Sequence, residues 1–268
     1  MPILTLTTDW GVCDPYVACF KGSLMMRNSS LQVIDISHEI THFDILTAAY
    51  IIKTTYDKFP KGSIHYIGLT GPENHDIEYP FLIVESDGYY FLGFDSGIFS
   101  LVLDEKPKNV FYLDARQHED RKKVEELVLD TLVSLGKGIN PSKLGTEQQG
   151  VLTSYFAVPT TDANTIRGSI IYVDSFGNAI MNVTKDFFEK EHKNRPFSIY
   201  MRKSNYTISK ISKSYEDTEN GEIVAFFNTN GYLEIALNRG NASGLLGLKV
   251  MDAIRINFND YQNSKNDL

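Results

Sequence analysis

PILTLTTDWGVCDPY, residues 2–16, is the stretch of sequence that decides the fold. Its first seven residues alternate apolar side chains with threonine, which is the period of a β-strand. Asp14 and Pro15 then form a pair that typically starts a helix, an N-cap followed by proline at the first helical position. The stretch therefore predicts a strand over residues 2–8 and a helix over residues 16–27.

The same alternation continues through the first half of the chain. Residues 32–36, QVIDI, are typical of a second strand, and residues 44–58 carry apolar side chains at near-helical spacing. Further strands are expected over residues 63–69, 81–85 and 89–93, and a further helix over residues 124–135. Strands that alternate with helices predict a layered α/β domain with a largely parallel sheet.

The pattern changes after Gly145, where short β-like runs follow one another between turn residues. These runs cover residues 168–173, 197–201, 206–211, 222–228, 232–237 and 253–258. Such regular punctuation predicts a small antiparallel β-barrel or sandwich. We therefore expect two domains, an α/β domain over residues 1–163 and a β-barrel domain over residues 164–268.

Composition argues against several classes of partner. The net charge of −8 and the pI near 5.3 oppose a phosphate backbone, so nucleic acid is not expected as a partner. No apolar run reaches the roughly 18 residues of a membrane span, and the first residues lack the basic region of a signal peptide. Cys13 and Cys19 are too few and wrongly spaced for a disulfide framework or a zinc knuckle, which fits a reducing cytoplasm.

Residues 38–42, HEITH, satisfy the H-E-x-x-H pattern of zinc hydrolases. That chemistry needs a helix, because only there do two histidines four residues apart share one face and reach the same metal. Here the motif follows a strand and precedes the helix expected from Asp44, so a connecting loop is expected and a metal is not. A zinc hydrolase using His38, Glu39 and His42 stays a distant alternative.

Asp9 lies at the expected carboxyl end of the first strand. Ligands of open α/β sheets bind at that edge, and a carboxylate can accept two hydrogen bonds from a vicinal diol. Asp9 is therefore chemically suited to a ribose, although an aspartate in this position can equally cap its own loop.

Five stretches, in the same order along the chain, resemble the S-adenosyl-L-methionine (SAM) hydroxide adenosyltransferase, fluorinase and chlorinase family. Residues 7–16, TTDWGVCDPY, are similar to that family's T-T-D-F-G-x-x-D-P-Y, and residues 33–38 with 43–45 to its V-D-I-T-H and F-D-I. The other three are GFDSGIFS at 93–100, YVDSFGN at 172–178 and NTNGYLEIA at 228–236. Together they span nearly the whole chain.

The resemblance implies an amino-terminal α/β domain, a carboxy-terminal β-barrel and a homotrimer. SAM would bind between the first domain of one subunit and the second domain of its neighbour, as substrate or ligand and without a further cofactor. Asp9 would hold the ribose hydroxyls.

The resemblance also implies roles for residues on both domains. Phe43 would supply an apolar wall of the pocket, and Phe176 would stack on the adenine. Asn178 would contact the polar edge of adenine, Asp174 would pair with the methionine ammonium, and Thr229 would contact the methionine carboxylate. Taken alone, residues 176–178 are also typical of a β-turn with no ligand.

The residues with which the hydroxide-transferring relatives position and activate water are absent. Thr70 stands at the position of their Asp, Ile77 near that of their Arg, and residues 122–126, KKVEE, near that of their His. The serine that helps to hold halide in the fluorinase falls near Val124, beside Glu125 and Glu126, so a halide cradle is not expected either.

Three interpretations remain open. The leading one is an adenosyl-binding protein that hydrolyses SAM to adenosine and L-methionine at a reduced rate, with no catalytic residue identified beyond Thr70 at the family's Asp position. The alternative is a nucleoside-binding or sensing protein of the same fold without catalysis. The third is a different reaction in the same pocket.

Overall fold

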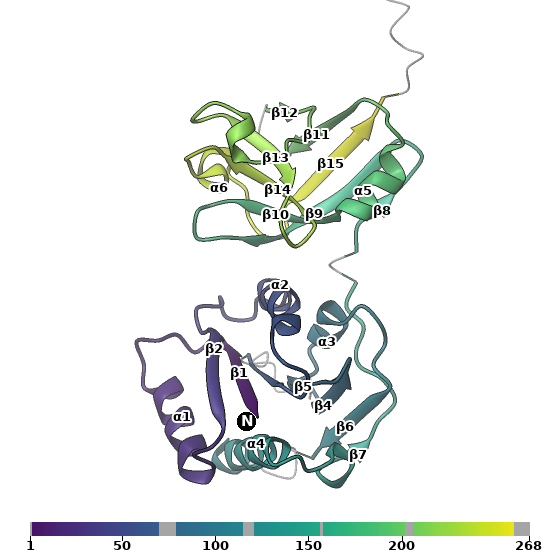
Figure 1. Cartoon of the computed structure of the whole chain (residues 1–268). Helices are drawn as coiled ribbons and strands as arrows, with labels where there is room; N and C mark the ends of the chain where they lie inside the picture. Colours follow the sequence, from purple (N-terminus) through teal and green to yellow (C-terminus); the bar gives the residue numbers. More distant parts are fainter. Residues whose placement is uncertain (1, 70–78, 115–120, 156–157, 202–205, 260–268) are drawn as a thin grey trace, which may run out of the picture. The chain divides into compact units, whose positions relative to one another are not determined.

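A computed structural model describes residues 2–69, 79–114, 121–155, 158–201 and 206–259 (Figure 1). The chain forms two compact units, Met1–Ser154 and Tyr155–Leu268. The predictions at residues 70 and 77 lie outside the described residues. Among the described residues, no helix combines the length and apolar character needed to cross a membrane.

The first unit is a layered α/β domain. Its elements are β1 (Ile3–Thr8), α1 (Tyr16–Arg27), β2 (Gln32–Ser37), α2 (Ile45–Thr55), η1 (Tyr56–Lys58), β3 (Ile64–Gly68), β4 (Phe81–Ser86), β5 (Tyr89–Phe94), α3 (Ile98–Val102), β6 (Asn109–Leu113), α4 (Arg121–Gly136), η3 (Pro141–Lys143) and β7 (Thr146–Glu147). The sheet has the order β2-β1-β3-β5-β4-β6-β7. Its first four strands run parallel, and the pairs that involve β4, β6 and β7 are antiparallel, so the sheet is mixed.

Helices cover both faces of this sheet (Figure 1). On one face, side chains of α1 and α4 such as Leu24 and Leu132 pack on Leu4 and Leu6 of β1. On the other face, α2 and α3 pack on the sheet through residues that include Ile52. Burial of apolar side chains on both faces is the main force that holds such a layered domain together.

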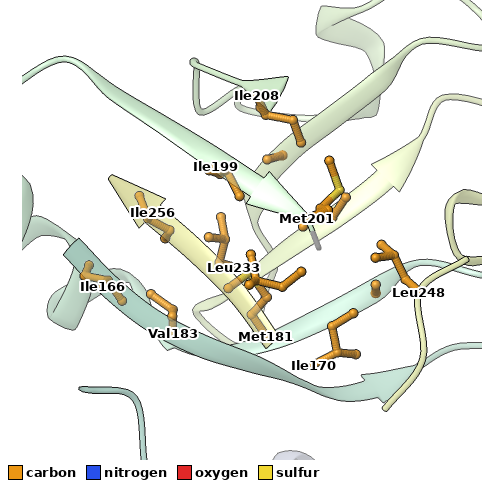
Figure 2. Packing of buried hydrophobic residues seen from close by; sticks show 14 of the residues in the cluster. Ile166, Ile170, Met181, Val183, Ile199, Met201, Ile208, Leu233, Leu248 and Ile256 are labelled. Carbon is orange, nitrogen blue, oxygen red and sulfur yellow. The ribbon is translucent and has the colours of Figure 1, made fainter. Parts of the chain in front are cut away.

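The second unit is an antiparallel, barrel-like domain. Its elements are β8 (Thr160–Thr161), β9 (Thr165–Val173), β10 (Ala179–Thr184), α5 (Lys185–His192), β11 (Phe197–Met201), β12 (Thr207–Ile208), η4 (Tyr215–Asp217), β13 (Ile223–Phe227), β14 (Tyr232–Leu237), α6 (Ala242–Leu246) and β15 (Ala253–Phe258). The strand order is β12-β11-β15-β9-β10-β14-β13, and β8 pairs with β9. The end strands β12 and β13 contact each other, so the sheet curls almost closed around an apolar core. Figure 2 shows Met181, Leu233 and Ile256 among the side chains of that core.

These two architectures confirm the predicted fold class, but one local prediction is wrong. Asp14 does not cap α1: Pro15 occupies the N-cap position, no side chain caps the helix there, and Asp14 is exposed. Pro15 has φ and ψ of −74° and −5°, in the helical region, and it is the N-cap. The cap therefore lies one residue later than predicted. Asp44, in contrast, caps α2 by accepting a hydrogen bond from the Thr47 amide.

Candidate ligand site

The carboxyl ends of the parallel strands carry the polar residues of the first domain. Asp9 follows β1, His38 follows β2 and Asp95 follows β5, and the ladder between these strands is parallel. Their side chains therefore belong to one edge of the sheet, which is the edge where open α/β sheets bind ligands.

Asp9 is buried, and an imidazole lies beside it. The Asp9 side chain has no exposed surface, and its Oδ2 lies 3.5 Å from Nδ1 of His42, whose side chain is 69% exposed. A buried carboxylate at this edge needs polar partners, because an isolated buried charge is costly. The proximity of His42 to Asp9 was not predicted from the sequence, where His42 figured only as a zinc ligand of the distant alternative.

The two histidines of the H-E-x-x-H pattern contact different partners. His38 is buried, with Nδ1 2.7 Å from the Thr8 hydroxyl and Nε2 3.2 Å from Asp35. Burial acts to raise the pKa of Asp35, but Lys21 and the His38 imidazole outweigh it and hold this pKa below its ordinary value. Residues 38–42 are not helical, and no group of three His, Cys, Asp or Glu side chains among the described residues could hold a metal. The segment therefore lacks the geometry that the zinc pattern requires.

Phe43 lies next to His42 in a strained conformation. Its φ is +67°, in the left-handed region that residues other than glycine seldom adopt, and half of its surface is exposed. The ring centroids of His42 and Phe43 are 6.3 Å apart. Strain of this kind persists only where the surroundings fix it, here by the Asp44 cap on α2, and it is frequent at ligand sites.

Asp95 is buried and has a structural role. Its Oδ1 accepts from the Gly97 amide at 3.3 Å and its Oδ2 from the Leu152 amide at 2.7 Å, so it links the end of β5 to a segment far along the chain. Burial raises the pKa of this carboxyl above its ordinary value, while the two amides act to lower it. Asp95 is also 0% exposed, so its remaining acceptor sites do not face solvent.

The second domain presents a tight turn between β9 and β10. Oδ1 of Asp174 accepts from the amides of Phe176 and Asn178, at 3.0 and 2.8 Å, and its Oδ2 accepts from Nδ2 of Asn178 at 2.9 Å. The Gly177 amide donates to the Asp174 carbonyl. The β-turn typical of residues 176–178 is therefore present, and Asp174 holds it together.

This turn carries an exposed aromatic ring two residues before a buried amide. Phe176 is 76% exposed, whereas Asn178 is buried. Gly177 has φ +84°, and a Cβ there would lie 2.2 Å from Oδ1 of Asn241 at the start of α6. Only glycine fits this position, so the packing on α6 fixes the point at which Phe176 projects.

A second turn, between β13 and β14, carries Thr229. Oδ1 of Asn228 accepts from the amides of Asn230 and Tyr232, both at 3.1 Å, and Thr229 is exposed at the turn. Nδ2 of Asn228 donates to Oε2 of Glu234 at 3.2 Å. The asparagine therefore fixes the turn and ties it to the buried carboxylate of β14.

Sequence reasoning missed two residues that join these turns. Tyr215 donates its hydroxyl to Oε1 of Glu234 at 2.5 Å and lies 3.3 Å from Nδ2 of Asn178. Glu234 offered a signal, since it is the one charged residue in the buried β14 run, whereas nothing in the sequence singled out Tyr215.

The stretch near the family's His, residues 122–126, lies in the first turns of α4. Lys122, Lys123, Glu125 and Glu126 are exposed there, and Val124 packs against the apolar face of the sheet. None of these side chains matches the imidazole that the family places there.

Known proteins match the chain along nearly its full length. The family model of the SAM hydroxide adenosyltransferase N-terminal domain matches residues 4–144, and that of the C-terminal domain matches residues 168–255. The chain is 29% identical over 271 residues to an (R)-S-adenosyl-L-methionine hydrolase of Methanocaldococcus jannaschii, which covers 96% of each protein. It is 23% identical to a hydrolase of the same name from Thermus thermophilus, over 93% of this chain and 97% of the relative.

A solved structure confirms the fold. An uncharacterized conserved protein from Thermotoga maritima superposes with a TM-score of 0.82 at 22% identity, covering 95% of this chain and 99% of that one. At that identity the likeness concerns the fold alone. The two family models together span well over half of the sequence, and the chain belongs to the SAM hydroxide adenosyltransferase family.

Proposed function

We propose that the protein binds SAM and hydrolyses it to adenosine and L-methionine at a reduced rate. The observation that carries the proposal is the β9–β10 turn, which presents the exposed Phe176 ring next to the buried Asn178 amide. An aromatic face and an amide suit the flat face and polar edge of adenine. The names of the Methanocaldococcus and Thermus relatives support SAM as the substrate.

The remaining binding roles follow from the chemistry of each side chain. Asp9, a buried carboxylate at the ligand-binding edge of its sheet, would accept hydrogen bonds from the ribose hydroxyls. Phe43 would supply an apolar wall, and Thr229 would donate to the methionine carboxylate. Asp174 already accepts three hydrogen bonds, so it retains capacity for about one more, from the methionine ammonium.

The reaction needs little activation of the leaving group. Water attacks C5′ of the ribose, the C5′–S bond breaks with its electron pair moving to sulfur, and the products are adenosine, methionine and one proton. Because the sulfonium is already a good leaving group, the main task of the protein is to position water. The sequence offers Thr70 and Ile77 in place of the family's Asp and Arg, which supports slow turnover.

The same substitutions favour the second candidate, a nucleoside-binding or sensing protein without catalysis. Exposed Lys123, Glu125 and Glu126, near the family's His position, provide no imidazole for proton transfer. The two candidates share the binding residues and differ only in turnover.

Calorimetry with SAM, adenosine and S-adenosylhomocysteine, followed by product analysis of SAM incubations, separates the candidates. Release of adenosine and methionine in equal amounts supports slow hydrolysis, and binding without products supports the sensing protein. If none of the three ligands binds at millimolar concentration, the adenosyl-binding proposal is wrong.

We also propose a homotrimer with an intersubunit site, as the family resemblance implies, acting in the cytoplasm. Cys13 and Cys19, both free and exposed, are compatible with a reducing compartment.

A further inference from the structure

A continuous chain of hydrogen bonds joins the two turns of the second domain. Nδ2 of Asn178 lies 2.9 Å from Oδ2 of Asp174 and 3.3 Å from the Tyr215 hydroxyl. The hydroxyl lies 2.5 Å from Oε1 of Glu234, whose Oε2 accepts from Nδ2 of Asn228 at 3.2 Å. Asp174 holds the turn of Phe176, and Asn228 holds the turn of Thr229, so one network spans both.

The chemistry of the end groups fixes the direction of every bond in this network. A carboxylate can only accept, so the atom of Asn178 that faces Asp174 must be the amide nitrogen. The Tyr215 hydroxyl has one proton, which it must donate to the Glu234 carboxylate. It therefore accepts from Asn178, and both protons of the Asn178 amide nitrogen are used.

The other end of the Asn178 amide has no such partner. No hydrogen bond from the described residues reaches its Oδ1, which leaves that oxygen as the only ligand-binding atom of the side chain. An oxygen of this kind can only accept. It suits a base edge that carries an amine, such as the exocyclic amine of adenine, and it repels a base with a carbonyl in that place.

Tyr215 and Glu234 are well fixed for this task. Glu234 is 5% exposed on β14, and the Tyr215 ring packs edge-on against Phe226 of β13 with 4.6 Å between ring centroids. Tyr215 itself is 38% exposed, and it is the buried Glu234 carboxylate, which can only accept, that sets the direction of the chain.

We propose that Tyr215 and Glu234, acting together with Asp174, are positioning residues that lock the Asn178 amide with its oxygen toward the ligand, making the site selective for a 6-amino over a 6-oxo purine nucleoside. The inference rests on the proposed function, because it assumes that a nucleoside binds at this turn. It assigns a role to two residues that need not contact the ligand.

The test compares adenosine with inosine by calorimetry on the full-length protein. The wild type should bind adenosine at least about tenfold more tightly, since inosine would set two acceptors against each other. Tyr215→Phe keeps the ring and removes the hydroxyl. The ratio of the affinity for adenosine to the affinity for inosine should therefore fall about three- to tenfold. Tyr200→Phe is the matched control, because the Tyr200 hydroxyl makes no hydrogen bond to the described residues and its loss should leave the ratio unchanged.

A double variant reverses the network. In Asp174→Asn with Glu234→Gln, the new amide nitrogens donate toward Asn178 and Tyr215, so the Asn178 amide turns and presents its nitrogen to the ligand. Oδ1 of the new asparagine still accepts from the two turn amides, which preserves the turn. This variant should prefer inosine, the opposite of the wild type.

The outcomes distinguish the inference from the proposed function. If the wild type binds adenosine but Tyr215→Phe and Tyr200→Phe give the same ratio as the wild type, the positioning role is wrong and adenosyl binding stands. If the wild type binds neither nucleoside, the proposed function fails and this inference fails with it. A merely structural role would lower both affinities together and leave their ratio unmoved, which also overturns the inference.

Discussion

Acidification is expected to destabilise the first domain through one buried imidazole, His65 on β3. His65 is 3% exposed, and its Nδ1 lies 2.8 Å from the Thr5 hydroxyl. Its ring stacks on Phe91 at 5.2 Å, with Tyr56 and Tyr89 also packed against it, and its Nε2 has no hydrogen-bond partner among the described residues. These aromatic neighbours supply no carboxylate to pair with a protonated imidazole.

Burial lowers the pKa of His65 from 6.5 to about 4. The unfolded chain therefore takes up a proton as the pH falls below 6.5, whereas the folded domain takes it up only near pH 4. The stability that His65 contributes is complete above pH 6.5 and is lost between 6.5 and 4. At 1.36 kcal/mol per pKa unit, the loss amounts to about 3 kcal/mol of unfolding free energy.

Trp10 makes the measurement specific for this domain. It is the single tryptophan of the chain, and it packs against Phe20 and Tyr66 in the first domain, so its fluorescence reports the unfolding of that domain. Urea unfolding would be followed at pH values from 7 to 4 for the wild type and for His65→Gln, whose neutral side chain can keep a bond to Thr5. Subtracting the two curves removes the contribution of other titrating groups, such as Asp35.

The wild type should lose about 3 kcal/mol more than His65→Gln over this interval. His192→Gln, which changes an imidazole of the second domain, serves as the control and should follow the wild type in Trp10 fluorescence. Parallel curves for the wild type and His65→Gln would refute the argument that burial keeps this imidazole neutral.

Four further predictions concern the ligand site. Gly177→Ala should lower the melting temperature and nucleoside affinity by more than Gly221→Ala, because both glycines have φ +84° but only the Gly177 Cβ would collide with Asn241; equal effects would contradict this. Asp174→Ala should weaken both SAM and adenosine, SAM by about tenfold more, since it removes the turn and one charge-assisted contact; calorimetry with both ligands checks this, and equal losses would exclude an ammonium contact. Turnover at saturating SAM should be about 10²–10⁴-fold below that of a relative that carries the family's Asp, Arg and His, and Thr70→Asp alone should restore little of it; equal turnover numbers would show that the absent residues are dispensable. Light scattering should give a mass of about three chains, and a monomer with full nucleoside affinity would rule out an intersubunit site.

The periodic segments of the first domain were predictable, because their burial pattern is visible in the order of apolar residues. The helix over residues 16–27 has the predicted bounds, and the strand over residues 32–36 is extended by one residue to Ser37. Strand β10 was not predicted, because AIMNVT is buried along nearly its whole length and so shows no alternation of apolar and polar residues. The two-residue strand β12, where six residues were expected, shows that β-propensity without paired neighbours does not extend a strand.

For the candidate site, the sequence predicted which strand end or turn a residue occupies, but not which side chains it contacts. The sequence placed Asp9 at the end of a strand and residues 176–178 in a turn, since both depend on local signals. It could not show that Tyr215 lies against Asn178 and Glu234, because these residues are distant in sequence and only the pairing of β10 with β14 and the contact of η4 with β13 bring them together. A loop residue outside any motif gives no local signal of such a contact.

The residues proposed for binding differ physically from those that the family uses for chemistry. Asp174 holds its turn through three hydrogen bonds, Gly177 is required by the packing on α6, and Asn178 is part of the network that joins β10 to β14. Loss of any of them would disturb the fold as well as the ligand. A side chain that only positions water does not also hold the fold together, so its replacement lowers activity without lowering stability. We therefore expect the binding turns to be retained wherever the domain is stable and the water-activating positions to change more freely, which would separate affinity from turnover in this chain.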